Sequence, residues 1–162
     1  MSQIRDDLNY LKRWYAWHES WAHIEGRPII FVYNEGGCEV ADRWMGANNG
    51  EWFIVLKLFE GHQNCQFQPD QWHEYAPAAA VVTKPGFSFA VSPGFWRADK
   101  TSPTLPRVRE QAWRANIAEM VNSNENWQLI TTFNEWGEGT TVESAQEWAS
   151  ASGYGIKLQC SS

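Results

Sequence analysis

The apolar run Gln128-Leu129-Ile130-Thr131-Thr132-Phe133 leads directly into the loop Asn134-Glu135-Trp136-Gly137-Glu138-Gly139-Thr140. Because the run is rich in β-branched and apolar residues, it is typical of a strand that is buried on both faces. Such strands occur mainly in parallel sheets that helices cover. The acidic, glycine-containing loop stands where this strand would end, so the two together define a strand-and-loop pattern.

The same pattern occurs earlier in the chain. Apolar runs predict buried strands at residues 29–33, 52–56 and 87–92, in addition to 128–133. Apolar spacing and capping residues predict helices at residues 6–24, 38–48, around 70–75, 107–122 and 144–152. This alternation of strands and helices predicts an α/β fold with four parallel βα units in one domain, residues 1–162.

Two parallel architectures fit this alternation. An open, doubly wound sheet could be complete within the 162 residues. A closed (β/α)₈ TIM barrel needs about 250 residues, so the chain would hold only half of it. Periodicity does not separate the two, although the absence of a GxGxxG or phosphate-binding loop weighs slightly against a nucleotide-binding open sheet.

The composition narrows the functional class. The net charge of −6 argues against a broad nucleic-acid surface, and the 43% apolar and 20% charged residues are ordinary for a globular protein. Tryptophan is in excess, with 11 residues. An indole ring offers a flat apolar face that suits a pyranose, although any single tryptophan can equally belong to the core. No stretch is long enough to predict a membrane span, and the N-terminus predicts no secretory signal.

The cysteines and histidines give no sign of a metal site or a nucleophile. Cys38, Cys65 and Cys160 lack the spacing of zinc ligands. A disulfide between Cys38 and Cys65 and a set of buried free thiols are both compatible with the sequence. The four histidines form no recognisable pair with serine or cysteine, so they are interpreted as structural or peripheral. We expect neither a metal nor an organic cofactor.

In both architectures the active site lies at the carboxyl ends of the strands. The side chains that follow the predicted strands are Asn34, Glu35, Lys57, Glu60, Trp96, Arg97, Asp99, Asn134, Glu135, Trp136 and Glu138. Glu135 and Glu138 share one loop, in which Gly137 allows a tight turn. Two nearby carboxylates resist both being ionised, so one can keep a proton and act as the general acid of glycosidic bond cleavage. The alternative is a pair of solvated acids without a role.

The segment 129–140, followed by Val142-Glu143, resembles the last barrel strand of glycoside hydrolase family 99, the endo-α-1,2-mannosidases and mannanases. The stretch 91–95, with Asp99, Arg107 and Arg109, resembles the preceding strand and loop of that family. The resemblance is good over residues 87–146 and thinner over 27–60. Gly137 departs from the family, which usually has histidine there, and the family's tyrosine near the carboxylates has no clear counterpart.

This resemblance implies the C-terminal half of a (β/α)₈ barrel that acts on α-linked glycans with retention of configuration. It implies that Glu135 assists the substrate's 2-hydroxyl through a 1,2-anhydro sugar and that Glu138 is the general acid and then the general base. The substrate-binding candidates are Asn34, Glu35, Trp96, Arg97, Asp99, Asn134 and Trp136. The same motif also resembles glycosyltransferase-like barrels of bacterial polysaccharide biosynthesis, and a non-catalytic carbohydrate-binding barrel is a third hypothesis.

A half-barrel would expose two unpaired strand edges. We therefore expect the chain to be a fragment that needs the missing barrel half or a dimer to close. We expect its partner to be an oligosaccharide or polysaccharide rather than nucleic acid, and its full-length parent to be secreted or periplasmic.

Overall fold

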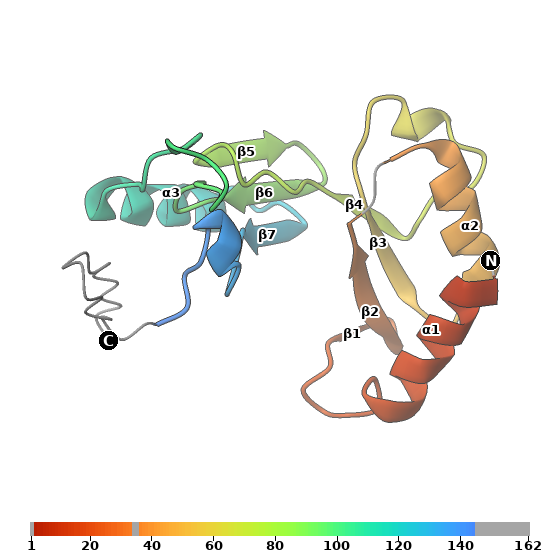
Figure 1. Ribbon diagram of the computed structural model, residues 1–162. Coiled ribbons are helices and arrows are strands. Elements are labelled where there is room, and N and C mark those ends of the chain that lie inside the picture. Colours follow the sequence, from red (N-terminus) through yellow and green to blue (C-terminus); the bar gives the residue numbers. More distant parts are fainter. Residues whose placement is uncertain (1, 34–35, 145–162) are drawn as a thin grey trace. The chain divides into compact units, whose positions relative to one another are not determined.

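The computed structural model describes residues 2–33 and 36–144 (Figure 1). The chain divides into two compact units. The N-terminal unit comprises Met1–Tyr75 and Gly86–Ser88, and the C-terminal unit comprises Ala76–Pro85 and Phe89–Ser162. The helix predicted at 144–152 lies, from residue 145 onward, outside the described residues.

The N-terminal unit contains a four-stranded sheet in the order β1-β2-β3-β4. Its strands are β1 (His23–Ile24), β2 (Arg27–Val32), β3 (Phe53–Lys57) and β4 (Gln71–His73). Strands β2 and β3 pair in parallel, as do β3 and β4, whereas the short β1 pairs with β2 in the antiparallel sense. The two strands predicted at 29–33 and 52–56, and their parallel pairing, are therefore confirmed.

The helix predicted around residues 70–75 is wrong, because this segment is strand β4. Gln71, Trp72 and His73 pair with Val55, Leu56 and Lys57 of β3. Trp72 is buried and belongs to the same core cluster as Leu56. A segment of three residues is too short to show either a helical or an alternating period, and its pairing with β3 decides its conformation.

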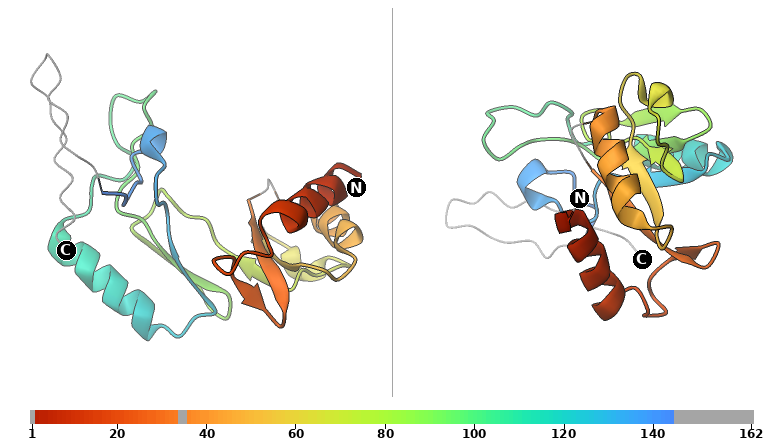
Figure 2. Two further views of the ribbon diagram at one scale, coloured as in Figure 1. Left: turned by 90° about the horizontal axis from the view of Figure 1, so that it is seen from below. Right: turned by 90° about the vertical axis from the view of Figure 1, so that its right-hand side faces the viewer.

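Helices α1 (Ser2–Trp14) and α2 (Cys38–Asn48) cover one face of this sheet (Figures 1 and 2). The buried residues between the helices and the sheet are Leu8, Ala16, Val32, Ala41, Trp52, Ile54, Leu56 and Trp72. Helix α2 has the predicted bounds, and the residue that caps it, Asn49, adopts the left-handed conformation with φ 50°. A disulfide joins Cys38, the first residue of α2, to Cys65, which follows the short 3₁₀ helix His62–Asn64.

Helix α1 ends at Trp14, so the prediction of a helix through residue 24 is wrong in its second half. The aromatic residues beyond Trp14 serve other contacts. The indole N–H of Trp21 donates to the carbonyl of Ile29 at 2.9 Å, and its ring packs edge-on against Trp52 at a centroid distance of 5.9 Å. These contacts with the sheet require a turn where the spacing of the aromatic residues predicted a helix.

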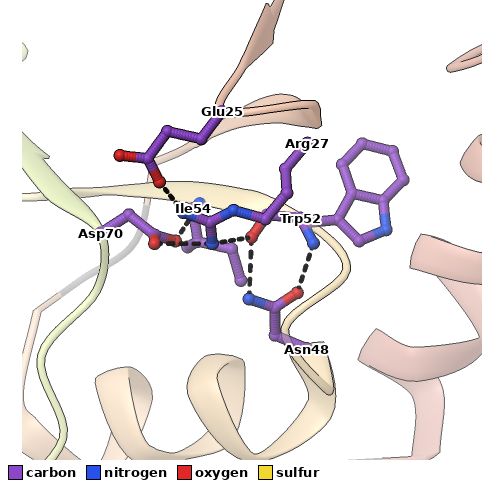
Figure 3. Close-up of polar contacts among 6 residues, drawn as sticks. All are labelled: Glu25, Arg27, Asn48, Trp52, Ile54 and Asp70. Carbon is purple, nitrogen blue, oxygen red and sulfur yellow. Dashed lines mark hydrogen bonds and ion pairs between the residues drawn. The ribbon is translucent and has the colours of Figure 1, made fainter.

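A polar network closes the amino ends of the three parallel strands (Figure 3). The Arg27 guanidinium lies 2.7 Å from an Asp70 carboxylate oxygen and 3.0 Å from Glu25. The other Asp70 oxygen accepts the backbone N–H of Ile54 at 2.8 Å. The Asn48 side chain exchanges two hydrogen bonds with the backbone of Trp52, at 2.9 and 2.8 Å. This end of the sheet is thus tied together by groups that satisfy one another.

The C-terminal unit contains a three-stranded sheet in the order β5-β6-β7. Its strands are β5 (Val81–Lys84), β6 (Ser88–Val91) and β7 (Trp127–Ile130), and helix α3 (Glu110–Asn122) connects β6 with β7. In Figure 1 the arrows of β6 and β7 point the same way and that of β5 points the opposite way. Phe89, Val91 and Met120 form the buried core, against which Val81, Trp113 and Ile117 pack.

The strand predicted at 87–92 and the helix predicted at 107–122 are confirmed, with α3 beginning three residues late. The strand predicted at 128–133 is present as β7 but ends at Ile130, and its residues alternate between half-buried and exposed, so the expectation that it is buried on both faces is wrong. Val108 donates its backbone N–H to Pro93 at 2.8 Å, which holds the start of the predicted helix against the preceding loop. Strand β5 has no counterpart among the predicted strands.

The fold is therefore mixed α/β, as predicted, but its strands form two sheets. In the part of the chain that the structure describes, no closed barrel is seen, and the prediction of a half-barrel of four parallel βα units is not confirmed. The reason is the pairing of the strands. Strand β4 pairs with β3 in the first sheet, and β6 pairs with β5 and β7 in the second, so the four predicted strands do not form one continuous sheet. None of the helices within residues 2–33 and 36–144 is long and apolar enough to cross a membrane.

Candidate functional site

The two segments that flank the loop after β7, residues 132–133 and 140–143, are hydrogen-bonded to each other. Thr132 donates its backbone N–H to the Thr140 carbonyl at 3.0 Å, and the two threonine hydroxyls are 2.7 Å apart. The N–H groups of Val142 and Glu143 donate to the carbonyls of Thr132 and Phe133 at 3.0 and 2.8 Å. Residues 134–139, which include both candidate glutamates, thus span a loop whose base is fixed.

Glu135 is positioned by the same two threonines. Its backbone N–H donates to the Thr132 hydroxyl at 3.1 Å, and its carbonyl lies 3.5 Å from the Thr140 hydroxyl. Thr140 is fully buried, which fixes the inner end of these contacts, whereas the hydrogen bond from Glu135 to Thr132 is exposed. The carboxylate itself is exposed and lies against Gly137, where an added Cβ would stand 3.4 Å from Oε1. A glycine at 137 therefore leaves the space beside the Glu135 carboxylate open.

Glu138 is the last residue of the short 3₁₀ helix η2 (Trp136–Glu138), and its side chain is half-buried. Its carbonyl accepts the N–H of Trp96 at 2.8 Å, and the carbonyl of Gly137 accepts the N–H of Ala98 at the same distance. Gly139 then turns the chain with φ 62°, and an added Cβ there would stand only 3.1 Å from the Trp96 carbonyl oxygen. The loop 96–98 is thereby bound directly to the turn that carries Glu138.

Arg107 binds the segment that follows Glu138 in this loop. Its guanidinium donates to the carbonyls of Gly139 and Thr141, at 3.3 and 2.9 Å. Arg107 is one of the residues on which the resemblance to glycoside hydrolase family 99 depends. In the structure it is a positioning residue for the loop that carries Glu138.

Aromatic surface surrounds the loop. Trp96, Phe133 and Trp136 are 51%, 65% and 49% exposed. The indole N–H of Trp136 donates to the Glu143 carboxylate at 3.0 Å, and that of Trp96 donates to the Lys100 carbonyl at 2.9 Å. Each indole thus has its polar group satisfied while it exposes apolar ring surface, which is the combination that suits contact with a sugar ring.

Arg97 and Asp99 pair with each other. The guanidinium makes two contacts with the carboxylate, at 3.0 and 3.1 Å, and both side chains are about half exposed. The structure therefore places Trp96 and Arg97 beside the turn that carries Glu138, and the Arg97 guanidinium is paired with the Asp99 carboxylate. Asn134 is exposed and its carbonyl accepts the Trp136 N–H at 3.0 Å. Asn34 and Glu35 lie outside the described residues.

A second polar and aromatic cluster, at the carboxyl ends of β2, β3 and β4, was not assembled from the sequence. The Lys57 ammonium lies 4.8 Å from the centroid of the Tyr33 ring, and Tyr33 contacts Tyr75 edge-on at 4.9 Å. His73, interpreted from the sequence as structural, is buried beside Phe31 and lies 3.3 Å from the Val32 carbonyl. Burial lowers the pKa of His73, so its imidazole is neutral at pH 7. Only the register of the three strands reveals this cluster.

Among the described residues, no group of three or more histidine, cysteine or acidic side chains is arranged to hold a metal ion. The chemistry that the Glu135 loop can offer is proton transfer and charge stabilisation by carboxylates next to apolar ring surface.

No protein-family model matches this chain, and no curated protein matches it. The solved structures that are similar to it in fold include two of the GH99 endo-alpha-mannosidase from Bacteroides thetaiotaomicron. The complex with Bis-Tris propane has a TM-score of 0.71 at 16% sequence identity, and a second structure has a TM-score of 0.69 at 18% identity. Both similarities cover 97% of this chain but only 59% and 56% of the solved chains. The chain is therefore similar in fold to a little over half of a GH99 endo-α-mannosidase, as the residues of its last strand and loop predicted.

Proposed function

We propose that the protein is a retaining glycosidase that hydrolyses α-linked glycans, with mannose polymers as the first substrates to test. In this proposal Glu138 protonates the leaving oxygen and later activates water, while Glu135 assists the substrate's own 2-hydroxyl in forming a 1,2-anhydro sugar. The observation that carries the proposal is the anchoring of both glutamates on one loop. A loop fixed before the substrate arrives costs no ordering entropy during the reaction. The fold similarity to endo-α-mannosidases supports the same conclusion.

The surroundings of the loop support a sugar as the ligand. Trp136, within the turn that carries Glu138, and Trp96, whose backbone N–H binds that turn, both offer exposed ring surface. Asn134, Arg97 and Asp99 supply polar groups that can bind hydroxyls. The candidate contacts from Asn34 and Glu35 stay predictions.

The test is hydrolysis of α-linked oligosaccharides by the wild-type protein and by Glu135→Gln and Glu138→Gln. General acid–base catalysis contributes about 10²–10⁴-fold, so the kcat/KM of Glu138→Gln should fall by that factor. An aryl glycoside, whose leaving group needs no proton, should restore most of the kcat/KM of Glu138→Gln, which reports the first step, but not that of Glu135→Gln; kcat of Glu138→Gln should stay low because the second step still lacks its general base. The first product seen by NMR should have the α configuration.

Glu119→Gln is the matched control, because it removes an exposed acid on α3 and should leave kcat/KM unchanged. Undiminished hydrolysis by Glu138→Gln, or a β-configured first product, would contradict the assigned roles.

A non-catalytic carbohydrate-binding protein is the second candidate, favoured by the exposure of Trp96, Phe133 and Trp136. Both Gln variants would then bind oligosaccharides as well as the wild type, and no variant would release reducing ends. A glycosyltransferase-like barrel would need a sugar-nucleotide donor, so turnover without any donor would exclude it.

We also propose that the protein works in an oxidising compartment, secreted or periplasmic. The Cys38–Cys65 disulfide supports this, because disulfides persist outside the reducing cytosol.

A further inference from the structure

The three parallel strands of the N-terminal unit end in a row of side chains that the glycosidase proposal does not use. Val32, Leu56 and Trp72 stand level with one another and belong to the core beneath the helices. The next residues along the three strands are Tyr33, Lys57 and His73, of which Lys57 and His73 are register partners. Because side chains alternate along a strand, this row lies on the face that α1 and α2 do not cover.

Contacts within the row gather an aromatic ring and a cation. The Lys57 ammonium lies 4.8 Å from the centre of the Tyr33 ring, and the edge-on contact of Tyr75 orients that ring from another side. Tyr33 nevertheless remains 66% exposed. The buried imidazole of His73 is uncharged, because burial lowers its pKa and the positive charge of the neighbouring Lys57 lowers it further.

Lys57 has no acidic partner within the described residues, where no carboxylate lies within 4.0 Å of its ammonium group. The nearby Glu74 carboxylate accepts the backbone N–H of Tyr75 at 3.1 Å. A half-buried ammonium that contacts no carboxylate of residues 2–33 and 36–144, in a protein with a net charge of −6, is a locally positive position. A bound anion would supply the charge-assisted hydrogen bond that the described residues do not.

We propose that Tyr33 and Lys57 form a binding subsite for an anionic sugar, a pyranose that carries a carboxylate or a sulfate ester. The exposed Tyr33 ring contacts the apolar face of the sugar, and the Lys57 ammonium binds its anionic group. An ammonium is a compact point charge and does not distinguish by geometry between a carboxylate and a sulfate. Combined with the proposed glycosidase activity, on which this step rests, the subsite makes the substrate an acidic glycan.

The test is isothermal titration of the protein with three α-linked trisaccharides: a neutral mannotriose, its sulfated derivative and a trigalacturonate. We expect the wild-type protein to bind at least one acidic trisaccharide tenfold or more tightly than the neutral one, and added salt to weaken only the acidic binding. Lys57→Met should bring the ratio of the affinities close to one. Which acidic trisaccharide binds distinguishes a uronate from a sulfate ester.

The control is Lys12→Met, which removes the same charge from an exposed lysine on α1 that pairs with Glu51 at 2.8 Å. It should leave the ratio of the affinities unchanged. Tyr33→Ala should weaken the binding of neutral and acidic trisaccharides alike, and Lys57→Gln is the second variant should Lys57→Met fail to fold. Equal affinities in the wild type, or an equal loss in Lys12→Met and Lys57→Met, would overturn the proposal.

The outcome is separable from that of the glycosidase proposal. Hydrolysis of neutral glycans with no preference for acidic ones would remove the subsite and leave the glycosidase. A preference for acidic trisaccharides that depends on Lys57, in a protein that hydrolyses nothing, would leave the subsite and remove the glycosidase.

Discussion

Replacing Asp70 should destabilise the fold through two separate contacts. One carboxylate oxygen accepts the N–H of Ile54 at 2.8 Å, and the other lies 2.7 Å from the Arg27 guanidinium (Figure 3). The Asp70 and Arg27 side chains are 16% and 25% exposed, and Ile54 is completely buried. Consistent with this contact, the hydrogen bond to Asp70 is the main reason why the pKa of Arg27 is raised.

The size of the effect follows from what each variant leaves behind. In Asp70→Ala the buried Ile54 N–H loses its partner, which costs about 1–3 kcal/mol. Arg27 also loses its closest counter-charge but keeps Glu25 and the Trp52 carbonyl, so the full cost of breaking a buried ion pair, about 3–5 kcal/mol, does not apply. We expect a total loss of about 2–4 kcal/mol. Asp70→Asn retains an oxygen for Ile54 and should cost about half as much.

The assay is urea unfolding at pH 7, followed by far-UV circular dichroism. Asp99→Ala is the control, because its ion pair with Arg97 is half exposed and such pairs contribute about 0–1 kcal/mol. If Asp70→Ala cost no more than Asp99→Ala, or if Asp70→Asn cost as much as Asp70→Ala, the division into two contacts would be wrong.

Two further predictions concern stability. Because burial lowers the pKa of His73, the unfolded chain binds more protons below about pH 6.5, so stability should fall on acidification by at most about 1.4 kcal/mol per pH unit. His73→Gln should flatten this acid limb in urea unfolding between pH 5 and 8, and an unchanged slope would speak against the assignment. The Cys38–Cys65 disulfide closes a loop with a sequence separation of 27, for which loop entropy predicts a loss of about 3.5 kcal/mol on reduction. Urea midpoints with and without reductant measure it, and coincident midpoints would contradict the expectation.

The elements that the sequence predicted correctly are those whose burial is visible along the chain itself. Strand β3 is buried over four consecutive residues, and its apolar run shows this directly. Strand β4 has only three residues, and β5 has two exposed and two half-buried residues, so neither carries a recognisable period. The aromatic residues after Trp14 have helical spacing, but Trp21 is used to bind the Ile29 carbonyl.

The two clusters of candidate functional residues differ in the same way. Glu135 and Glu138 could be found from the sequence because one short loop carries both. The anchoring by Thr132, Thr140 and Arg107 could not, because hydrogen bonds between loop arms leave no period in the sequence. The row of Tyr33 and Lys57 depends on the register of strands whose facing residues are 24 positions apart, such as Phe31 and Val55. Hydrophobic runs identify strands but do not fix how far one slides along the next.

Charges at the two ends of the same three strands have different consequences. At the amino ends Arg27 pairs with Asp70 and Glu25, whereas at the carboxyl ends no carboxylate of the described residues contacts Lys57. At the amino ends, Asp70 accepts from Arg27 and from a buried N–H, so an incoming ligand would have to break contacts that the fold needs. At the carboxyl ends, the Lys57 ammonium lies against the Tyr33 ring and contacts no described carboxylate, so an anionic ligand would add a contact to it. A count of charged residues would rank Asp70 and Arg27 above Lys57 as a candidate site. The hydrogen-bond partners reverse that order, and the same reasoning places the exposed Glu135 carboxylate ahead of the paired Asp99.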